Sequence, residues 1–298
     1  MATVKLHIGP HKTATTRIQA CFAAKAEALS EAGIEYRSVG QIARLFRGGI
    51  RKVGLGRVSV EEAAAQIKPR LGGEAWKVDD LLLSFENSVG ISRHVLMPGT
   101  TPYEQLEKRL GLLQEVFADR DVTIFLAVRS YDKFFNSAYS EAVRARFDIS
   151  PEALGPFLME DHLRWPDFVA RVRQVFPDAS VRVWEHEKYR DQEAKVLGAI
   201  SGAPESLFAN ELPDADFRVS LSRDAVRALL AIQPHLPNSK LRDGPFAIAE
   251  ALEVAFPVTQ ENPTVSLWSD DELARLKAEY ADDVAEIKTM DGVDVVLA

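Results

Sequence analysis

Short apolar runs alternate along the chain with stretches of helical periodicity. The runs at 4–8, 81–85 and 122–128 are almost continuously apolar, and those at 34–39 and 180–185 also have the length of strands. Strands of this kind are typical of parallel sheets, whose two faces are both covered. The pattern predicts an α/β fold with a central parallel sheet of about five strands flanked by helices.

Between the strands, apolar side chains recur at the spacing of helices. Helices are expected to begin at Thr15 and at Tyr131 and to cover 59–69, 99–118, 165–176, 191–201, 223–232, 247–255 and 270–287. In the 99–118 helix, Thr101 is the expected N-cap, Pro102 the first residue, and Glu104 closes a capping box. No repeat or long linker interrupts the pattern, so we expect one domain, 1–298, with a helical C-terminal portion from roughly 205 to 298.

Residues 44–57 combine five cationic side chains with four glycines. Glycine weakens a helix, so this segment is predicted to be an exposed loop. Two interpretations stand side by side. It can be a mobile lid or docking edge for an anionic acceptor, or an ordinary solvated loop.

Composition narrows the class of protein. The chain has 298 residues, 46% apolar and 27% charged, which is typical of a soluble globular protein. Its net charge of −8 argues against general binding of nucleic acid or anionic membranes. With Cys21 alone no disulfide can form within the chain, and there is neither a secretory leader nor an apolar run near 18 residues. We therefore expect a cytoplasmic protein without a membrane span; its oligomeric state is open.

The strongest chemical signal lies in the loop that follows the first strand. It contains, in order, Gly9, Pro10, His11, Lys12, Thr13, Ala14, Thr15 and Thr16. A strand, a tight turn and a helix N-terminus direct backbone N–H groups toward an anion, and a lysine adds a positive charge. We interpret the loop as a phosphate or sulfate cradle. It lacks the Gly-Lys pair of the usual nucleotide-triphosphate loop, because Gly9 stands three residues before Lys12.

A second signal follows the strand at 122–128. Arg129 stands at the strand's carboxyl end, Ser130 can cap the next helix, and Ser137 and Tyr139 follow on that helix. A guanidinium and a hydroxyl in this arrangement can hold one phosphate group. The alternative from the residues alone is an arginine paired with Asp132 and a serine that faces solvent.

Both signals together resemble a known family. The segment from His7 to Thr16 resembles the 5′-phosphosulfate loop of the sulfotransferases that use 3′-phosphoadenosine 5′-phosphosulfate (PAPS), and especially the bacterial branch, in which the core is Lys-(Ser/Thr)-Gly-Thr-Thr. Ala14 stands where that core has glycine. Arg129, Ser137 and Tyr139 are similar to the family's 3′-phosphate element. The resemblance implies the P-loop-NTPase-like sulfotransferase fold, with PAPS as the donor, adenosine 3′,5′-bisphosphate (PAP) as the product and no metal.

Further residues are assigned with the help of this resemblance. Arg218 looks like part of a downstream Arg-x-x-Ser-x-Ser segment, where it either closes over the cofactor or lies on the surface. Glu86, at the end of a buried run, is the expected general base, because function gathers at the carboxyl ends of parallel strands. Lys12 is the cation expected to stabilise charge on the leaving group. His11 is the next candidate for the base. The group of residues 184–187 is a weak metal signal, and no metal is expected.

The sequence therefore predicts transfer of a sulfuryl group to a hydroxyl or amine of an unidentified small-molecule or glycan acceptor, for which a carbohydrate and a lipid are both candidates. Two alternatives come from other classes. A magnesium-dependent nucleotide kinase could use Thr13 and Glu86 to hold the metal. A module that only binds an anionic ligand would carry the same cradle and catalyse nothing. Binding of nucleic acid is not expected.

Overall fold

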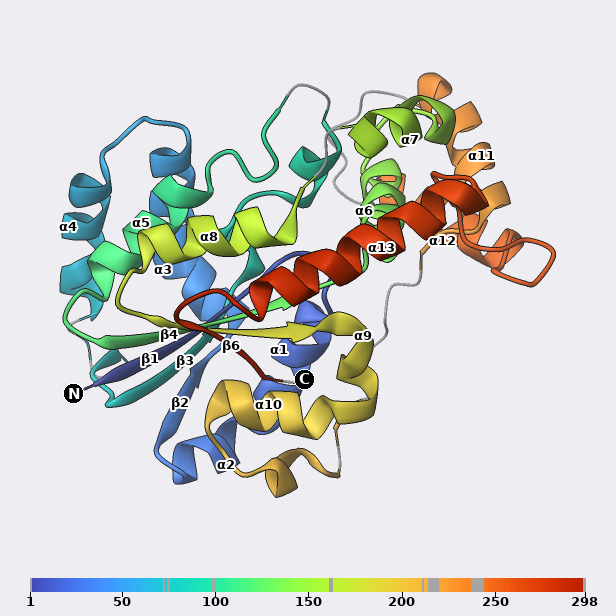
Figure 1. The fold of residues 1–298 in the computed structure, drawn as a ribbon. Helices are drawn as coiled ribbons and strands as arrows, with labels where there is room; N and C mark the ends of the chain where they lie inside the picture. Colours follow the sequence, from blue (N-terminus) through green and yellow to red (C-terminus); the bar gives the residue numbers. More distant parts are fainter. Residues whose placement is uncertain are drawn as a thin grey trace.

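The chain folds around a single six-stranded parallel sheet. A computed structural model describes residues 2–71, 73, 76–97, 100–160, 163–210, 212–213, 220–236 and 244–296. The strand order is β2-β3-β1-β4-β5-β6, and every neighbouring pair is parallel (Figure 1). The strands are β1 (Thr3–Gly9), β2 (Ile34–Arg37), β3 (Asp80–Ser84), β4 (Asp121–Val128), β5 (Ser180–Glu185) and β6 (Val293–Val295). The predicted α/β class and parallel sheet are confirmed, with a sixth strand, β6, added near the C-terminus.

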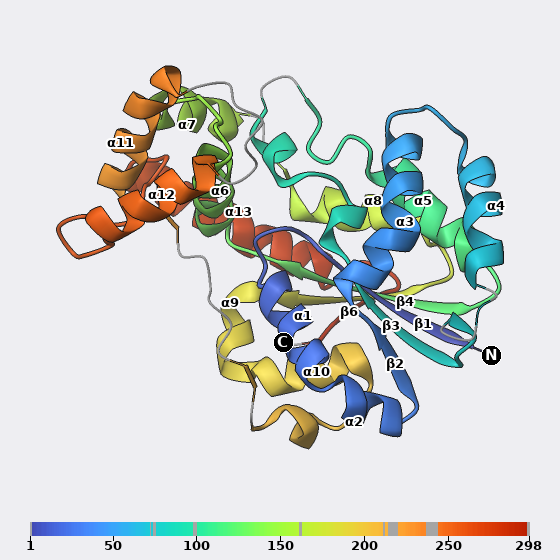
Figure 2. The ribbon, with the colours of Figure 1, turned by 180° about the vertical axis from the view of Figure 1, so that it is seen from behind.

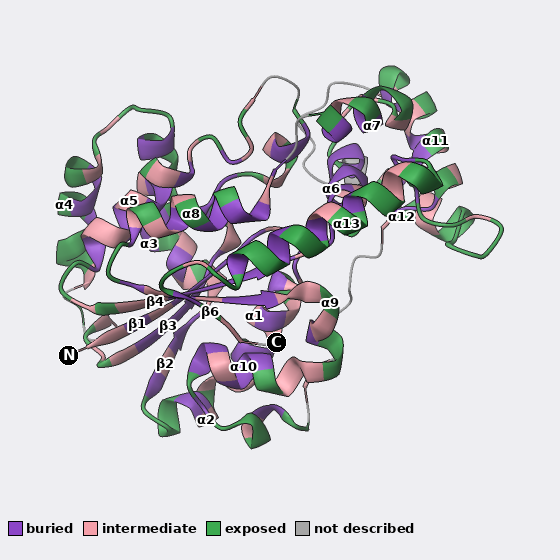
Figure 3. Ribbon diagram, viewed as in Figure 1, coloured by how far each residue is buried: buried purple, intermediate pink, exposed green. Residues whose placement is uncertain are grey.

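Helices cover both faces of the sheet, as the apolar strands require (Figures 1 and 2). One face packs against α3 (Val39–Gly54), α4 (Val60–Leu71), α5 (Leu106–Val116), α8 (Trp165–Val175) and α13 (Asp270–Ile287). The other packs against α1 (Thr15–Ala24), α2 (Ala26–Glu31) and α10 (Glu193–Ser201). Alternation along each strand divides the core: Leu81 and Leu83 belong to the first side, and Leu82 to the second. Figure 3 shows the buried strands between the two helical layers.

A group of helices lies beyond the carboxyl ends of the strands (Figures 1 and 2). Its members are α6 (Tyr131–Arg144), α7 (Pro151–Glu160), α11 (Arg223–Ile232) and α12 (Gly244–Ala255). The remaining short elements are η2 (Glu86–Ser88), η3 (Ser92–Leu96), α9 (His186–Tyr189), η4 (Arg190–Gln192), η5 (Glu205–Phe208) and η6 (Gln233–His235). Helix α13 runs from this group across the sheet, so the C-terminal portion is packed onto the same core as the N-terminal strands.

The prediction of a loop at 44–57 is wrong, because α3 extends through it to Gly54. Its buried face contains the apolar side chains Ile42, Leu45, Phe46, Ile50 and Val53. The helix begins at a capping box in which Ser38 and Gln41 satisfy each other's backbone N–H groups. Burial of this face offsets the cost of the two glycines inside the helix, which is about 1 kcal/mol each.

The prediction of one helix over 99–118 is also wrong at its start. Helix α5 begins at Leu106, and Tyr103 has a φ of 51°, which a helix cannot contain. Thr101, Pro102 and Glu104 therefore do not form the expected cap. The buried Tyr103 ring packs against Phe168, at 5.5 Å between ring centroids, and this tertiary contact outweighs the local capping signal.

No helix in the described ranges is long and apolar enough to cross a membrane.

Candidate active site

The loop between β1 and α1 has an unusual backbone. Strand β1 ends at Gly9, where φ is 93°, and α1 begins at Thr15. Lys12 and Ala14 both have a φ of 64°, in the left-handed region. Ala14 is also the N-cap of α1 and makes no side-chain cap hydrogen bond. The position at which the similar sulfotransferase core has glycine thus adopts a conformation that favours glycine, although alanine occupies it here.

The loop presents unused hydrogen-bond donors at the start of α1. Within the described part of the chain, no carbonyl or side chain accepts a hydrogen bond from the backbone N–H groups of Thr13, Ala14, Thr15 or Thr16. These donors lie at the positive end of the helix dipole. Four free N–H groups on successive residues fit a group with several anionic oxygens.

The threonine hydroxyls of the loop have different surroundings. Thr13 donates to the carbonyl oxygen of Pro10 at 2.5 Å, and Thr15 donates to the same oxygen at 3.3 Å. Both side chains are buried, whereas Thr16 is exposed. The hydroxyl proton of Thr13 therefore holds the loop closed on itself, whereas the Thr15 hydroxyl lies within reach of both the Pro10 carbonyl and the carboxylate of Glu86. Thr16 has the hydroxyl of this loop that is open to solvent.

Lys12 extends from the loop toward α6. Its Nζ lies 3.8 Å from Oε2 of Glu141, with 19% of the lysine side chain exposed. Glu141 also lies 3.5 Å from the guanidinium of Arg144. Since Ser137 precedes Glu141 by four residues on α6, both lie on one face of that helix. The face of α6 that contains Ser137 therefore adjoins the loop.

Glu86 lies directly against the loop, at the end of β3. A Cβ atom on Gly9 would come within 3.0 Å of the Cβ of Glu86, so only glycine allows this approach. Gln19 of α1 donates from Nε2 to Oε2 of Glu86 at 3.1 Å. Burial raises the pKa of the Glu86 carboxyl, and the Gln19 hydrogen bond and the charge of Lys12 offset this only in part. A carboxyl with a raised pKa is suited to accept a proton near neutrality.

His11 is held by two neighbours. Its Nδ1 lies 3.3 Å from the hydroxyl of Tyr103, and its Nε2 lies 3.4 Å from Oδ1 of Asn87. Burial, together with the charges of Lys12 and Arg109, lowers the pKa of His11 to about 4, and the Asn87 hydrogen bond opposes this only in part. His11 is therefore neutral at physiological pH and a weaker base than Glu86.

Arg129 reaches the loop from the carboxyl end of β4. Its Nη1 donates to the carbonyl oxygen of Lys12, and its own carbonyl accepts a hydrogen bond of 2.8 Å from Nε1 of Trp165. The Nε of Arg129 is buried and has no partner in the described part of the chain. Burial lowers the pKa of the guanidinium from its usual value. The partly buried guanidinium of Arg129 thus lies beside the cradle with one N–H group unpartnered among the described residues.

The other predicted residues are distributed differently. Ser137 is buried on α6, whereas the hydroxyl of Tyr139 donates to the carbonyl oxygen of Ile149 at 2.8 Å and is used within the fold. The buried Ser130 caps no N–H group of α6; its hydroxyl donates to Oδ1 of Asp132. Arg218 lies outside the described residues.

The weak metal signal at 184–187 has a structural explanation. Glu187 accepts hydrogen bonds from the backbone N–H of Ser130 at 2.9 Å and from the hydroxyl of Tyr280 at 2.8 Å. One donor directly precedes α6 and the other lies on α13, so Glu187 of α9 joins these two helices just beyond the end of β5. Among the described residues, no group of three His, Cys, Asp or Glu side chains has the arrangement of a metal site.

Sequence reasoning missed several contacts of the site. Gln19 stands four residues after Thr15, so the helical period could have placed both on one face of α1. Glu141 stands four residues after Ser137, so the same period could have placed these two residues on one face of α6. Tyr103 and Asn87 had no such signal, because their contact with His11 joins segments 76 to 92 residues apart.

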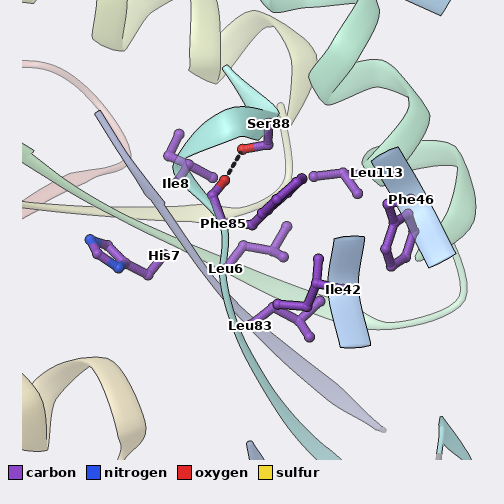
Figure 4. A pocket seen from close by; sticks show the side chains of 9 residues that line it. All are labelled: Leu6, His7, Ile8, Ile42, Phe46, Leu83, Phe85, Ser88 and Leu113. Carbon is purple, nitrogen blue, oxygen red and sulfur yellow. Dashed lines mark hydrogen bonds between the residues drawn. The ribbon is translucent and has the colours of Figure 1, made fainter. Parts of the chain in front are cut away.

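A small cavity close to β1 is distinct from this site (Figure 4). It is lined mainly by the apolar side chains of β1, β3, α3 and α5, and its volume of about 10 Å³ is close to that of a single water molecule. The ring of His7 points away from this lining, and its Nδ1 lies 2.8 Å from the hydroxyl of Ser84. Burial lowers the pKa of His7 to about 3, so His7 is a neutral packed side chain.

Comparison with known proteins gives one structural neighbour. No family model matches the chain, and no curated protein matches it. The crystal structure of a sulfotransferase from Alicyclobacillus acidocaldarius is similar, with 16% sequence identity and a TM-score of 0.41, over 85% of this chain and 96% of that chain.

Proposed function

We propose that this chain transfers a sulfuryl group from PAPS to a hydroxyl or amine of an acceptor. The observation that carries the proposal is the cradle itself: four free backbone N–H groups at the start of α1, with Lys12 in the same loop and Arg129 bound to the carbonyl of Lys12. This arrangement fits an anion with two charged ends. The free N–H groups suit the phosphosulfate, and the guanidinium of Arg129, which has an unpartnered N–H group, suits the 3′-phosphate.

The residues of the cradle act on the leaving group. Donors fixed before the reaction stabilise charge that develops on an oxygen without further reorganisation. The N–H groups of residues 13–16 and the ammonium of Lys12 would stabilise the phosphate oxygen as its bond to sulfur breaks. Arg129 and Ser137 would hold the 3′-phosphate, which ATP lacks, and so select PAPS.

Glu86 acts on the acceptor. As the new bond from the acceptor oxygen or nitrogen to sulfur forms, the acceptor's proton would pass to the carboxylate of Glu86. Its position against Gly9 places this base beside the cradle, and Gln19 orients the carboxylate through one oxygen. A positioned general base contributes on the order of 10²–10⁴-fold to the rate.

Calorimetric titration with PAP and with ATP, both in EDTA, tests the proposal. Tight binding of PAP, weak binding of ATP, and loss of PAP binding in Arg129→Ala are expected. Tighter binding of ATP that requires Mg²⁺ would favour the kinase instead. If the protein binds PAP but, when loaded with PAPS, turns over none of the acceptors offered, the alternative of a module that only binds an anionic ligand would be favoured.

A further inference from the structure

Helix α3 carries an unusual concentration of positive charge. Residues 36–60 contain five arginines and one lysine but no acidic side chain, although the whole chain has a net charge of −8. Five of these cations lie between 44 and 57. A charge of this sign, kept on one helix of an acidic protein, indicates a local partner of negative charge.

The cations form a stripe along the exposed face of α3. Arg44, Arg47 and Arg51 are spaced by three and four residues, and all three are exposed. None of them forms an ion pair with a carboxylate of the described residues, and Arg44 makes only a hydrogen bond of 3.3 Å to the carbonyl of Gly40. The apolar face of the same helix is buried in the core. The stripe is therefore a surface for an anion, since α3 has no free apolar face to insert into a membrane.

A surface pocket lies at the N-terminal end of this stripe. It has a volume of about 230 Å³ and is lined by Gln41, Arg44, Leu45, Arg70 and Trp76. The indole of Trp76 is half-buried, and the guanidinium of the buried Arg37, which is paired with Glu35, lies over it at 5.7 Å. The guanidinium groups that line the pocket itself belong to Arg44 and Arg70. An aromatic ring with arginines and an amide around it suits a sugar ring that carries a carboxylate or sulfate, because the ring stacks and the anion pairs with guanidinium.

The C-terminal end of α3 adjoins the candidate active site. A Cβ on Gly54 would lie 2.6 Å from Oε1 of Gln105 and 3.0 Å from Nε of Arg109. Arg109 donates from Nη1 to the carbonyl of Asn87 at 3.1 Å, and Asn87 follows Glu86 directly. With its 16 residues, α3 spans about 24 Å between the pocket and this end.

We propose that the arginine stripe of α3 (Arg44, Arg47, Arg51) and the Trp76 pocket bind an extended acidic oligosaccharide. We infer that this oligosaccharide is also the acceptor, and that step rests on the proposed function. The binding of the oligosaccharide to the stripe and the pocket does not depend on it. Carboxylate or sulfate groups along the chain pair with the stripe, one sugar ring occupies the pocket, and the far end lies toward Glu86. A partner of this length can contact the pocket at the N-terminal end of α3 and the candidate active site at its C-terminal end at the same time, which a small acceptor cannot do.

The test uses hexagalacturonate as the probe and neutral maltohexaose as its control. Of the four tryptophans, three are buried, so a change in intrinsic fluorescence reports on Trp76. The variant Arg44→Ala/Arg47→Ala/Arg51→Ala should bind hexagalacturonate at least tenfold more weakly and with less dependence on salt. The control Arg227→Ala/Lys277→Ala/Lys288→Ala removes three exposed cations from other surfaces and should bind normally.

Other outcomes overturn the proposal. They are equal binding of the two sugars, normal hexagalacturonate binding by the stripe variant, or tighter stripe-dependent binding of an oligothymidylate or of phosphatidylcholine vesicles that contain phosphatidylserine. Titration of the same variants with PAP separates the two proposals. Hexagalacturonate binding that depends on the stripe, without PAP binding, would contradict the proposed reaction and support the proposed binding surface. PAP binding without stripe-dependent hexagalacturonate binding would contradict the surface and leave the proposed reaction standing.

Discussion

The guanidinium of Arg129 donates a hydrogen bond to the backbone carbonyl of Lys12. These residues are 117 positions apart, and they belong to the two segments that carry the chemical signals of the sequence. Parallel neighbours β1 and β4 bring them together, because both residues follow the carboxyl ends of their strands. The hydrogen bond also fixes the carbonyl of a residue whose φ is positive, so Arg129 supports the shape of the loop as well as its charge.

Arg129→Ala should weaken PAP binding. Hydrogen bonds to charged groups contribute about 1.5–3 kcal/mol each, which predicts a loss of roughly 10- to 150-fold in affinity by calorimetry. Arg129→Lys should not restore it, since one ammonium cannot serve both the Lys12 carbonyl and a phosphate with fork geometry. Thermal melting of both variants checks that the fold is retained. Unchanged PAP affinity in Arg129→Ala would assign the 3′-phosphate to other residues.

Ala14→Gly should stabilise the protein. A left-handed backbone conformation costs a non-glycine residue about 1–2 kcal/mol. Glycine avoids this cost, but its greater freedom in the unfolded chain offsets about 0.5–1 kcal/mol of the gain. We expect a gain of about 0.5–1 kcal/mol in the free energy of unfolding, measured with urea, with PAP affinity equal or better. Ala20→Gly, in the regular part of α1, is the control and should lose about 1 kcal/mol. A loss in Ala14→Gly would contradict the φ of 64°.

Glu86→Gln should lower turnover and raise stability. Loss of the base predicts a decrease of about 10²–10⁴-fold in kcat with PAP binding retained. Burial raises the pKa of Glu86 in the folded state above the unfolded value of 4.5. The folded protein therefore binds the extra proton, and stability falls as pH rises from the unfolded pKa through the folded one.

Two measurements check the Glu86 prediction. At pH 7 the glutamine variant should melt at a higher temperature than the parent, with a smaller difference at pH 4, whereas Glu261→Gln, at an exposed position outside any helix, should change neither melting temperature nor turnover. In the parent, kcat/KM should fall with acidification through the raised pKa. Full activity in Glu86→Gln would make His11 the next residue to test.

Glu141→Gln should tighten the binding of anionic ligands. The carboxylate lies 3.8 Å from Nζ of Lys12 and repels an anion in the cradle, so its neutral isostere should raise PAP affinity by roughly three- to tenfold at low salt. Titration at low and high salt measures this, with Glu115→Gln as a remote control of equal charge. A fall in affinity would show that Glu141 positions Lys12 for the ligand.

Asp283→Ala should destabilise the whole domain. Asp283 of α13 is fully buried, and it accepts hydrogen bonds from Tyr131, from Nε of Arg164 at 3.1 Å and from the backbone N–H of Trp165 at 3.2 Å. Arg164 is 42% exposed and can turn to solvent, so the cost comes from the buried Tyr131 hydroxyl and Trp165 N–H, which each lose an acceptor at about 1–3 kcal/mol. Urea unfolding should show this loss in one cooperative transition, and the exposed Asp282→Ala should not. Two separate transitions would contradict the predicted single domain.

The sequence by itself determined the parallel sheet and most of its helices. A continuous apolar run such as 122–128 is buried on both faces only when helices cover both sides of the sheet. The helix at 270–287 could be predicted from the spacing of its own apolar residues. The cradle could also be located, because a loop between a strand and a helix at Thr15 is local in the chain. Local rules failed at α3 and at Tyr103, where burial against distant side chains outweighed the glycines of one segment and the capping residues of the other.

Only the tertiary structure decided which side chains meet in the site. The contacts of Arg129 with Lys12, of Glu86 with Gly9 and of His11 with Tyr103 join segments 77 to 117 residues apart. No local pattern encodes such distances, since they follow from the strand order β3-β1-β4 and from the register of each pair. The sequence named the residues of the cradle because their chemistry is local. The fold placed Glu86 and Arg129 beside it because adjacent parallel strands end at the same edge.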